Sequence, residues 1–267
     1  MRLILAAFAY LALAAPALAS QCFQLAHLGD ARVWNASLDV GEVRIKFVGH
    51  SAFRIETDQG NAAVTDFYGD VGPGPLPDAV TMNHAHTSHW TPFPPEGIEH
   101  VLKGWGDGVE PNLHEVLVGD MLIRNVPTDI RSWSGNRVEK YGNSIFIFEY
   151  EGLCIGHLGH LHHLPTDEHF AMIGRLDIVL TPVDGGYTMP IEDMIEVMRR
   201  VKARMIIPMH IFSPSSLERF LAGLSSQYEI EISDADEVVL SAATLPSQPT
   251  ITVLTPAARD SYLGWDD

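Results

Sequence analysis

The sequence of 267 residues is poor in basic side chains. Lys and Arg together number 17 against 34 Asp and Glu, which gives a formal net charge of -17. A protein that binds along nucleic acid, or that adheres to an anionic membrane surface, needs clustered Lys and Arg. We therefore expect neither nucleic acid nor an anionic membrane surface as a partner.

Cysteine is also scarce, with only Cys22 and Cys154. Neither residue belongs to a Cys-x-x-Cys pair, so a thiolate zinc site is not expected. Cys154 lies in an apolar run where a buried free thiol is ordinary. A disulfide between the two is the alternative if the chain is exported, and the sequence leaves both readings open.

The apolar run at the start of the chain is shorter than the ~20 residues that span a bilayer. It covers Leu3–Ala15, follows Arg2, and is closed by Pro16 and the small-x-small pattern Ala17-Leu18-Ala19. This combination is typical of a cleaved secretory signal peptide, with a retained anchor as the alternative. We expect residues 1–19 to be removed and the protein to be exported, periplasmic or secreted, without stable membrane insertion.

The rest of the chain has the composition of a globular protein, with 46% hydrophobic and 19% charged residues. Residues 20–41 lack periodicity and are predicted to be a lead-in to one domain, 42–267. Within that domain, alternating or short apolar runs predict strands. These runs cover residues 43–47, 53–56, 62–65, 78–82, 115–129, 144–156, 176–183 and 204–209, and two more lie in the tail, 229–255.

Two amphipathic stripes predict helices. One begins at Pro190 and runs to Val201, and the other runs to Leu224 with Ser215 or Ser216 as its predicted N-cap. The segments 69–77 and 90–115 are rich in Pro and Gly and are predicted to be loops. Strands followed by strand–helix–strand alternation indicate an α/β protein.

The histidines are concentrated where predicted strands end. His84, His86 and His89 follow directly on the predicted strand 78–82. Residues two apart in an extended segment point to one side, and one helical turn would return His89 to the same point. Because neutral imidazole is the commonest metal ligand, these three residues predict a metal site.

Further along the chain, His160 lies just beyond a turn at Gly159, and His210 ends a buried strand. Active sites of α/β proteins form at the carboxyl ends of strands, so both are predicted ligands. A structural role is the alternative for each. His157 is predicted to be a histidine within the strand that supports the site, and His162 and His163 are interpreted as exposed.

Several other side chains are candidates for supporting or catalytic roles. Asp66 and Asp129 each follow a strand and are predicted to accept the second N–H of a ligand histidine. Formation of a turn is the alternative for Asp66. His50 and Asp184 are predicted to act in catalysis, with a turn position and a helix cap as their respective alternatives.

Taken in order, these segments resemble the metallo-β-lactamase superfamily, and most closely its stand-alone hydrolases of the ascorbate-phosphate lactonase-like branch. The resemblance implies an αββα four-layer sandwich with a metal site at one sheet edge. It also implies a metal-dependent hydrolase acting on a small-molecule lactone, ester, thioester or phosphodiester. The matching segments are Val48–Phe53, Thr65–Asp66, His84–His89, His157–His160, Gly185–Met189 and Ile207–His210.

The sequence departs from the superfamily pattern at three places. Ser88 stands where the motif has Asp, His160 stands where a bridging Asp belongs, and the segment Val126–Ile130 lacks an expected histidine. Ser is a poor ligand, and His in place of Asp removes a negative charge. We therefore expect one tightly held metal or an unusual pair, with Zn²⁺ as the first candidate and Fe or Mn as alternatives.

The ligand set implied by the resemblance is His84, His86, His89, His160 and His210. A divalent metal lowers the pKa of its bound water to about 7 and polarises a carbonyl or phosphoryl oxygen. With Ser88 in place of Asp, proton handling is expected to fall to Asp184, His50 or Asp129. The alternative is a non-catalytic metal-binding member of the fold.

Overall fold

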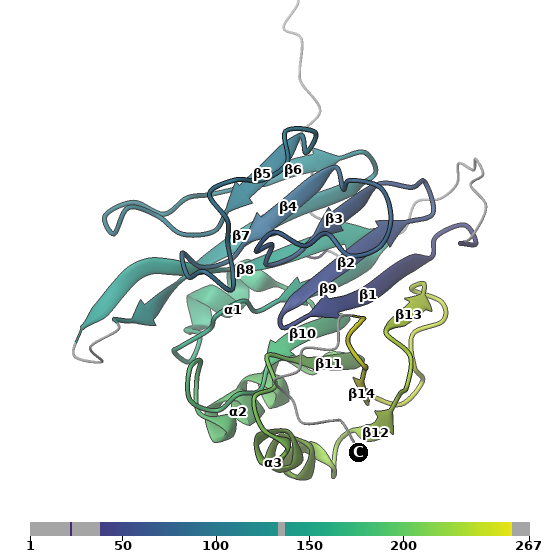
Figure 1. Ribbon diagram of the computed structural model, residues 1–267. Coiled ribbons are helices and arrows are strands. Elements are labelled where there is room, and N and C mark those ends of the chain that lie inside the picture. The colour runs from purple at the N-terminus through teal and green to yellow at the C-terminus, as the bar shows by residue number, and fades with distance from the viewer. Residues whose placement is uncertain (1–21, 23–37, 133–136, 258–267) are drawn as a thin grey trace, which may run out of the picture.

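The computed structural model describes Cys22 and residues 38–132 and 137–257. The predicted signal peptide, 1–19, and most of the predicted lead-in, 20–41, lie outside the described residues. The described part of the chain forms two β-sheets packed face to face (Figure 1).

The first sheet contains β1 (Val43–Gly49), β2 (Ala52–Thr57), β3 (Ala62–Val64), β4 (Ala79–Met82), β5 (His100–Lys103) and β13 (Glu237–Leu240). The second contains β6 (Glu115–Val118), β7 (Met121–Arg131), β8 (Val138–Tyr150), β9 (Leu153–His157), β10 (Ile178–Pro182), β11 (Met205–Met209), β12 (Glu229–Ile232) and β14 (Thr250–Val253). Their orders are β13-β1-β2-β3-β4-β5 and β12-β14-β11-β10-β9-β8-β7-β6.

The sheets face each other because each strand presents apolar side chains to the space between them. In β1, Val43, Ile45 and Phe47 are buried while Arg44 and Lys46 remain partly exposed, as the alternation in the sequence predicts. These side chains pack with others from β2, β8, β10 and β11 into one continuous core. Full burial of an aliphatic or aromatic side chain stabilises a fold by roughly 1.5–3 kcal/mol.

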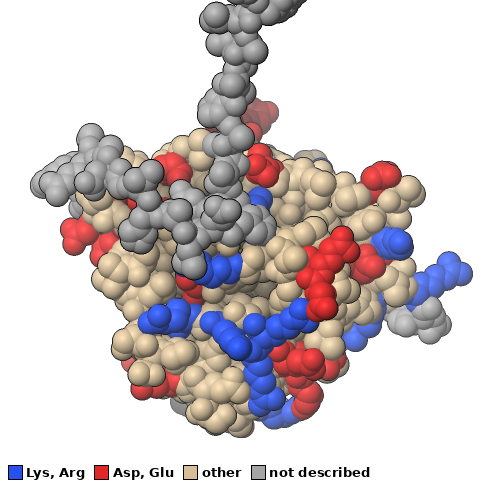
Figure 2. Space-filling model, turned by 180° about the vertical axis from the view of Figure 1, so that it is seen from behind, with Lys and Arg blue, Asp and Glu red and all other residues tan. Residues whose placement is uncertain are grey.

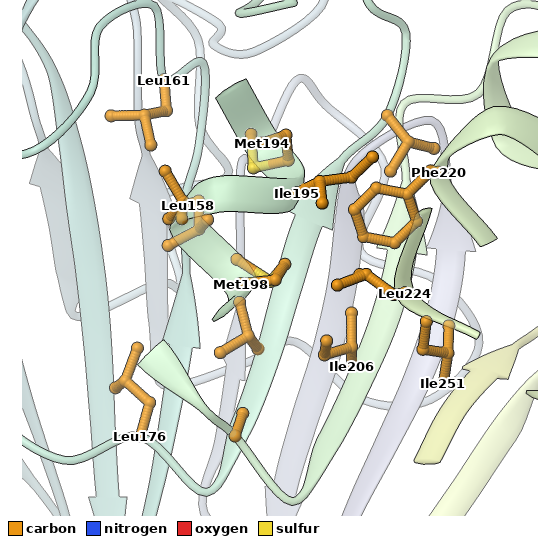
Figure 3. Packing of buried hydrophobic residues seen from close by; sticks show 14 of the residues in the cluster. Leu158, Leu161, Leu176, Met194, Ile195, Met198, Ile206, Phe220, Leu224 and Ile251 are labelled. Carbon is orange, nitrogen blue, oxygen red and sulfur yellow. The ribbon is translucent and has the colours of Figure 1, made fainter. Parts of the chain in front are cut away.

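The outer face of the second sheet is covered by the helices α1 (Asp167–Ile173), α2 (Ile191–Val201) and α3 (Pro214–Leu224). In Figure 3, Met194 and Met198 of α2 lie with Leu158 and Ile206 of the sheet side, and Phe220 of α3 lies beside Ile195. The predicted helix from Pro190 is therefore present, and its apolar stripe faces the sheet.

Three local elements differ from expectation. Helix α3 begins at Pro214 with Ser213 as its cap, because Ser213 Oγ accepts the Ser216 N–H, whereas Ser215 or Ser216 had been expected as cap. Strand β5 lies inside the predicted loop 90–115; its four residues show no alternation and are ordered by pairing with β4. Helix α1, with Thr166 as its cap, was not predicted.

Loops cover the outer face of the first sheet. Phe67, Trp90, Ile98 and Trp105 pack there on side chains of β3 and β4. The structure confirms the predicted sandwich: two sheets face each other, and helices cover the outside of the second sheet. In the described residues, loops form the layer outside the first sheet.

The sheet topology brings the ends of several strands to one edge. Strand β10 pairs in parallel with both β9 and β11, and β3 pairs in parallel with β4. Parallel neighbours end at the same edge of their own sheet. The edge of the first sheet, after β3 and β4, lies beside the edge of the second, after β9, β10 and β11. The residues that follow these strands include His160 after β9, Asp184 after β10, His210 after β11, Asp66 after β3 and His84 after β4.

Charged side chains are mixed on the surface. Figure 2 shows the side of the molecule opposite to that in Figure 1. On this side, Lys and Arg side chains gather in one region, with Asp and Glu side chains beside them. Ion pairs include Lys46 with Asp236 and with Glu237, each at 2.9 Å. In the described part of the chain, no helix is both long and apolar enough to cross a membrane.

A disulfide joins Cys22 to Cys154 on β9, across a separation of 132 residues. Of the two readings left open by the sequence, the structure has the disulfide. The backbone carbonyl of Cys22 also accepts a hydrogen bond from the Arg175 N–H. The cross-link therefore ties a residue near the start of the chain to the strand that leads into the histidine cluster.

We expect loss of this cross-link to destabilise the fold. Closing a loop of this length removes entropy from the unfolded chain, so the double variant Cys22→Ser/Cys154→Ser is expected to lose about 2–5 kcal/mol of unfolding free energy. Urea unfolding of the metal-free protein measures the change. Wild-type protein reduced with a phosphine should match the variant, and an unchanged unfolding midpoint in both would contradict a structural disulfide.

Candidate metal centre

Six histidine rings from distant parts of the sequence meet at the shared sheet edge. His50 lies in the β1–β2 turn, and the others follow β4, β9 and β11. Centroid distances are 4.4 Å for His50–His210, 4.7 Å for His89–His160, 5.1 Å for His84–His160, 5.2 Å for His89–His210 and 5.9 Å for His86–His89. All five predicted ligands are thus brought together, and His50 joins them.

The hydrogen bonds made by each ring show which nitrogen can bind a metal. A ring nitrogen that carries a proton donates, and only the unprotonated nitrogen offers a lone pair. A carbonyl or carboxylate partner must accept, so it fixes the proton on the nitrogen that faces it.

His89 is held by a carboxylate. Its Nδ1 donates to Asp66, which also accepts from the Ser51 hydroxyl at 2.5 Å. The Nε2 of His89 is buried and has no hydrogen-bond partner among the described residues. An orphaned lone pair on a side chain that is 1% exposed is costly unless something binds it, which fits a metal ligand. Asp66 occupies the supporting position that the sequence predicted.

His210 is held in the same way by Asp184. Its Nδ1 lies 2.8 Å from Asp184 Oδ2, so its Nε2 carries the lone pair. The carboxylate of Asp184 also accepts from the backbone N–H groups of Gly186 and Thr188 and from the Thr188 hydroxyl. Every acceptor position of Asp184 is therefore occupied by a group that fixes its orientation.

His84 is fixed by a backbone carbonyl. Its Nδ1 donates to Gly142 O at 2.7 Å, which again leaves the lone pair on Nε2. His86 lies further out, exposed, with its Nδ1 3.0 Å from the Ser88 hydroxyl. Ser88, which replaces the motif Asp, thus contacts a predicted ligand and lies beside the cluster.

His50 was predicted to act in catalysis, and its geometry places it with the ligands. One ring nitrogen each of His50, His89 and His210 lie within 4.8 Å of one another, close enough to hold a single metal ion. The Nε2 of His50 is also buried without a partner among the described residues. Its backbone is in the left-handed region, with φ 54°, because the chain turns sharply between β1 and β2.

His157 and Asp129 were both predicted to support the site, and their contacts differ. His157 is fully buried; its Nε2 donates to Ser51 O at 2.7 Å and its Nδ1 accepts from Gly159 N–H at 3.1 Å. Both nitrogens are used, so His157 supports the floor of the site, as its position in a strand predicted. Asp129 accepts from the Tyr141 backbone N–H, within the β7–β8 hairpin, and its carboxylate is not among the groups that hold a cluster histidine.

Burial favours the neutral form of His50, His84 and His210, the form in which imidazole binds a metal. It lowers the pKa of His84, His86 and His210, and it lowers that of His50 to about 3, with the neighbouring His210 and His89 adding to the effect. Burial alone would raise the pKa of Asp184, but the hydrogen bonds from His210 and Thr188 outweigh it and hold that pKa below its usual value.

One residue that the sequence placed at the surface belongs to the site. His162 is only partly exposed, and its Nε2 lies 2.6 Å from His160 Nδ1. The signal that could have found it is its spacing, two residues beyond His160 in the same turn.

Comparison with known proteins gives concordant results. A family model described as the beta-lactamase superfamily domain matches residues 44–210. A UPF0173 metal-dependent hydrolase of Pyrococcus abyssi is 27% identical over 63% of this chain and 84% of that protein. A second UPF0173 metal-dependent hydrolase, of Methanosphaera stadtmanae, is 23% identical over 78% of this chain and 97% of that protein.

A solved structure gives the same answer for the fold. A metallo-β-lactamase superfamily protein of Thermotoga maritima superposes with a TM-score of 0.58 at 28% identity, covering 79% of this chain and 98% of that one. The family match spans β1 to His210 and so includes every histidine of the cluster. The resemblance to the superfamily is confirmed, and the chain belongs to the metallo-β-lactamase superfamily.

Proposed function

We propose that the protein is a metal-dependent hydrolase of a small-molecule substrate, with the histidine cluster as its active site. The observation that carries the proposal is the common orientation of His84, His89 and His210. In each, a carbonyl or carboxylate holds the Nδ1 proton and leaves the Nε2 lone pair available. The relatives named as metal-dependent hydrolases support the same function.

His50, His89 and His210, whose ring nitrogens lie within 4.8 Å of one another, would hold the metal, with His84 and His86 as further ligands. An all-imidazole set suits Zn²⁺ first, with Fe as an alternative, and Mn less well because it prefers oxygen ligands. When bound, such an ion supplies Lewis-acid polarisation of a carbonyl or phosphoryl oxygen and acidifies a water molecule. The protein residues contribute orientation, since Asp66 and Asp184 each lock one ligand ring.

The rim of the site favours a substrate with an apolar portion. The ring of Phe212 lies 4.7 Å from that of His210, and Tyr187 packs on Phe212 at 5.1 Å. Their exposed fractions are 41% and 65%, which is high for large rings beside a buried polar cluster. Exposed aromatic rings at such a place are typical of ligand contact. We include lactones, esters, thioesters and phosphodiesters with an apolar group as the substrate class.

A metal-binding protein without turnover is the second candidate. It is favoured by one observation: the carboxylates of Asp66 and Asp184 are both occupied by hydrogen bonds to the protein. Neither is left unpaired to accept a proton from water. The two candidates differ only in turnover, so one experiment separates them.

The test compares wild type with His89→Ala, with His100→Ala as the matched control. His100 lies on β5 in contact with Glu99, so its loss leaves the cluster intact. Loss of a residue that only hydrogen-bonds a ligand lowers metal affinity by about 10–100-fold. Because His89→Ala removes a ligand itself, we expect it to weaken Zn²⁺ binding by more than that. Chelator competition measures the affinity, and a panel of lactone, ester, thioester and phosphodiester substrates measures hydrolysis.

Hydrolysis that a chelator abolishes and added metal restores, absent in His89→Ala and present in His100→Ala, is the expected result. Metal binding without hydrolysis of any panel member would favour the second candidate. Equal metal affinity in wild type, His89→Ala and His100→Ala would contradict both candidate functions, because the histidine cluster would then not be the metal site.

Asp184→Asn separates an orienting role from a role as base. If Asp184 orients His210, the variant binds Zn²⁺ about 10–100-fold more weakly, and excess metal restores much of the hydrolysis. If Asp184 is the base predicted from the sequence, metal affinity stays and the rate is lost at every metal concentration. Zn²⁺ titration followed by rate measurement distinguishes the two.

The metal-free protein is expected to lose stability as the pH falls below 6.5. The pKa of His50 is about 3 in the folded protein and 6.5 when unfolded, so between these values the unfolded chain binds a proton that the folded chain does not. Stability therefore falls with decreasing pH, by up to about 1.4 kcal/mol per pH unit for such a group. Urea unfolding between pH 6.5 and 5 measures the slope, which should be shallower in His50→Gln; equal slopes would contradict a neutral, buried His50.

A further inference from the structure

The contact between His160 and His162 fixes the protons on both rings. His162 Nδ1 lies 2.9 Å from the backbone nitrogen of Arg131, and its Nε2 lies 2.6 Å from His160 Nδ1. A backbone N–H can only donate, so His162 Nδ1 must carry a lone pair. The proton of His162 is then on Nε2, from which it is donated to His160 Nδ1.

The same reasoning continues to His160. Because its Nδ1 accepts from His162, the proton of its own ring is on Nε2. This is the opposite of His84, His89 and His210, in which Nδ1 carries the proton and Nε2 the lone pair. Of these four rings, His160 alone has its remaining nitrogen in the donor state.

The Nε2–H of His160 lies on the side of its ring that faces His89 and His210. The rings of His89 and His210 contact the ring of His160, at 4.7 and 5.4 Å, whereas the ring of His162 contacts His160 at 4.8 Å and is not in ring contact with either. The two nitrogens of an imidazole point in nearly opposite directions. With Nδ1 toward His162, Nε2–H points away from it.

The surrounding structure holds this arrangement in place. The His160 backbone N–H donates to Asn143 Oδ1 at 2.7 Å. Gly159 before it has φ +59°, and a Cβ there would lie 2.5 Å from side-chain atoms of both Asn143 and Asn83, so the turn requires glycine. The guanidinium of Arg131 donates to Thr188 O at 2.5 Å, which anchors the residue whose N–H orients His162.

We propose that His160 is a hydrogen-bond donor to a substrate oxygen that gains negative charge, rather than a metal ligand, and that His162 positions it. The proposal rests on the function proposed above and assigns a new role to the position where the superfamily pattern has an aspartate. A neutral imidazole N–H can stabilise such an oxygen. Removing one donor of this kind typically lowers kcat by about 10²–10³-fold.

The direct test is the protonation pattern of the histidine rings. Long-range ¹⁵N–¹H correlation spectra of ¹⁵N-histidine-labelled protein distinguish protonated from unprotonated ring nitrogens. Spectra of His160→Gln and His162→Phe assign the two residues. We expect His160 to be protonated on Nε2 in the metal-free protein and to remain so after Zn²⁺ is added, while the Nε2 signals of His84, His89 and His210 shift.

Metal affinity supplies an independent readout. His160→Gln and His160→Leu should bind Zn²⁺ within about twofold of wild type, in contrast to His89→Ala. In His162→Phe the constraint on His160 is removed, so its Nδ1-protonated form should appear in the spectrum. A His160 Nε2 that loses its proton on Zn²⁺ binding, or a tenfold loss of affinity in His160→Gln, would overturn the proposal.

The catalytic part is tested on whichever panel substrate wild type hydrolyses. His160→Leu should lower kcat by about 10²–10³-fold, and His160→Gln, which keeps an N–H donor, should recover part of it. An unchanged kcat in His160→Leu would refute the donor role. If wild type hydrolyses nothing, the proposed function fails and the catalytic role of His160 fails with it, while the spectra still decide whether His160 is a ligand.

Discussion

The site depends on the hydrogen bond between Asp66 and His89. It joins a carboxylate at the end of β3 to the last histidine of the His84–His89 segment, and both side chains are buried. A histidine ring has two equivalent-looking nitrogens, and only a partner on one of them decides which can bind a metal. Asp66 holds the proton on Nδ1 of His89 and so leaves Nε2 free to bind a metal. Asp184 does the same for His210, and Gly142 O does the same for His84.

Burying these groups is costly unless every polar atom is satisfied. The fold meets the requirement with the two-sheet frame. Ser51 donates its hydroxyl to Asp66 and its carbonyl accepts from His157, so one residue of the β1–β2 turn serves two buried side chains. Asn83 lies against His157 from the other side, through its side-chain nitrogen. The atoms left without partners among the described residues include Nε2 of His50 and of His89, both in the proposed ligand set.

Much of this site could be predicted from the sequence because the residues that build it follow strands. His84, His210 and Asp66 each come after a buried apolar run, and parallel pairing brings such ends together. His50 and His162 were placed less well. The ring of His50 reaches the cluster through a left-handed turn, and the role of His162 depends on the backbone N–H of Arg131, more than thirty positions away. Neither the direction of a hydrogen bond nor a distant backbone donor leaves a periodic signal.

The placement of Asp66 and Asp184 also sets the charge balance of the centre. Both carboxylates are held ionised directly behind ligand histidines, one at each of two rings. An imidazole ligand brings no negative charge, so these two carboxylates are the negative groups that contact ligand rings. The two negative charges of Asp66 and Asp184, which lie behind the ligand rings, balance the charge of one divalent cation. A second ion would add two positive charges that no carboxylate balances in a largely buried place. We therefore propose that this centre holds one divalent ion, whose charge is balanced by the two carboxylates behind the ligand rings.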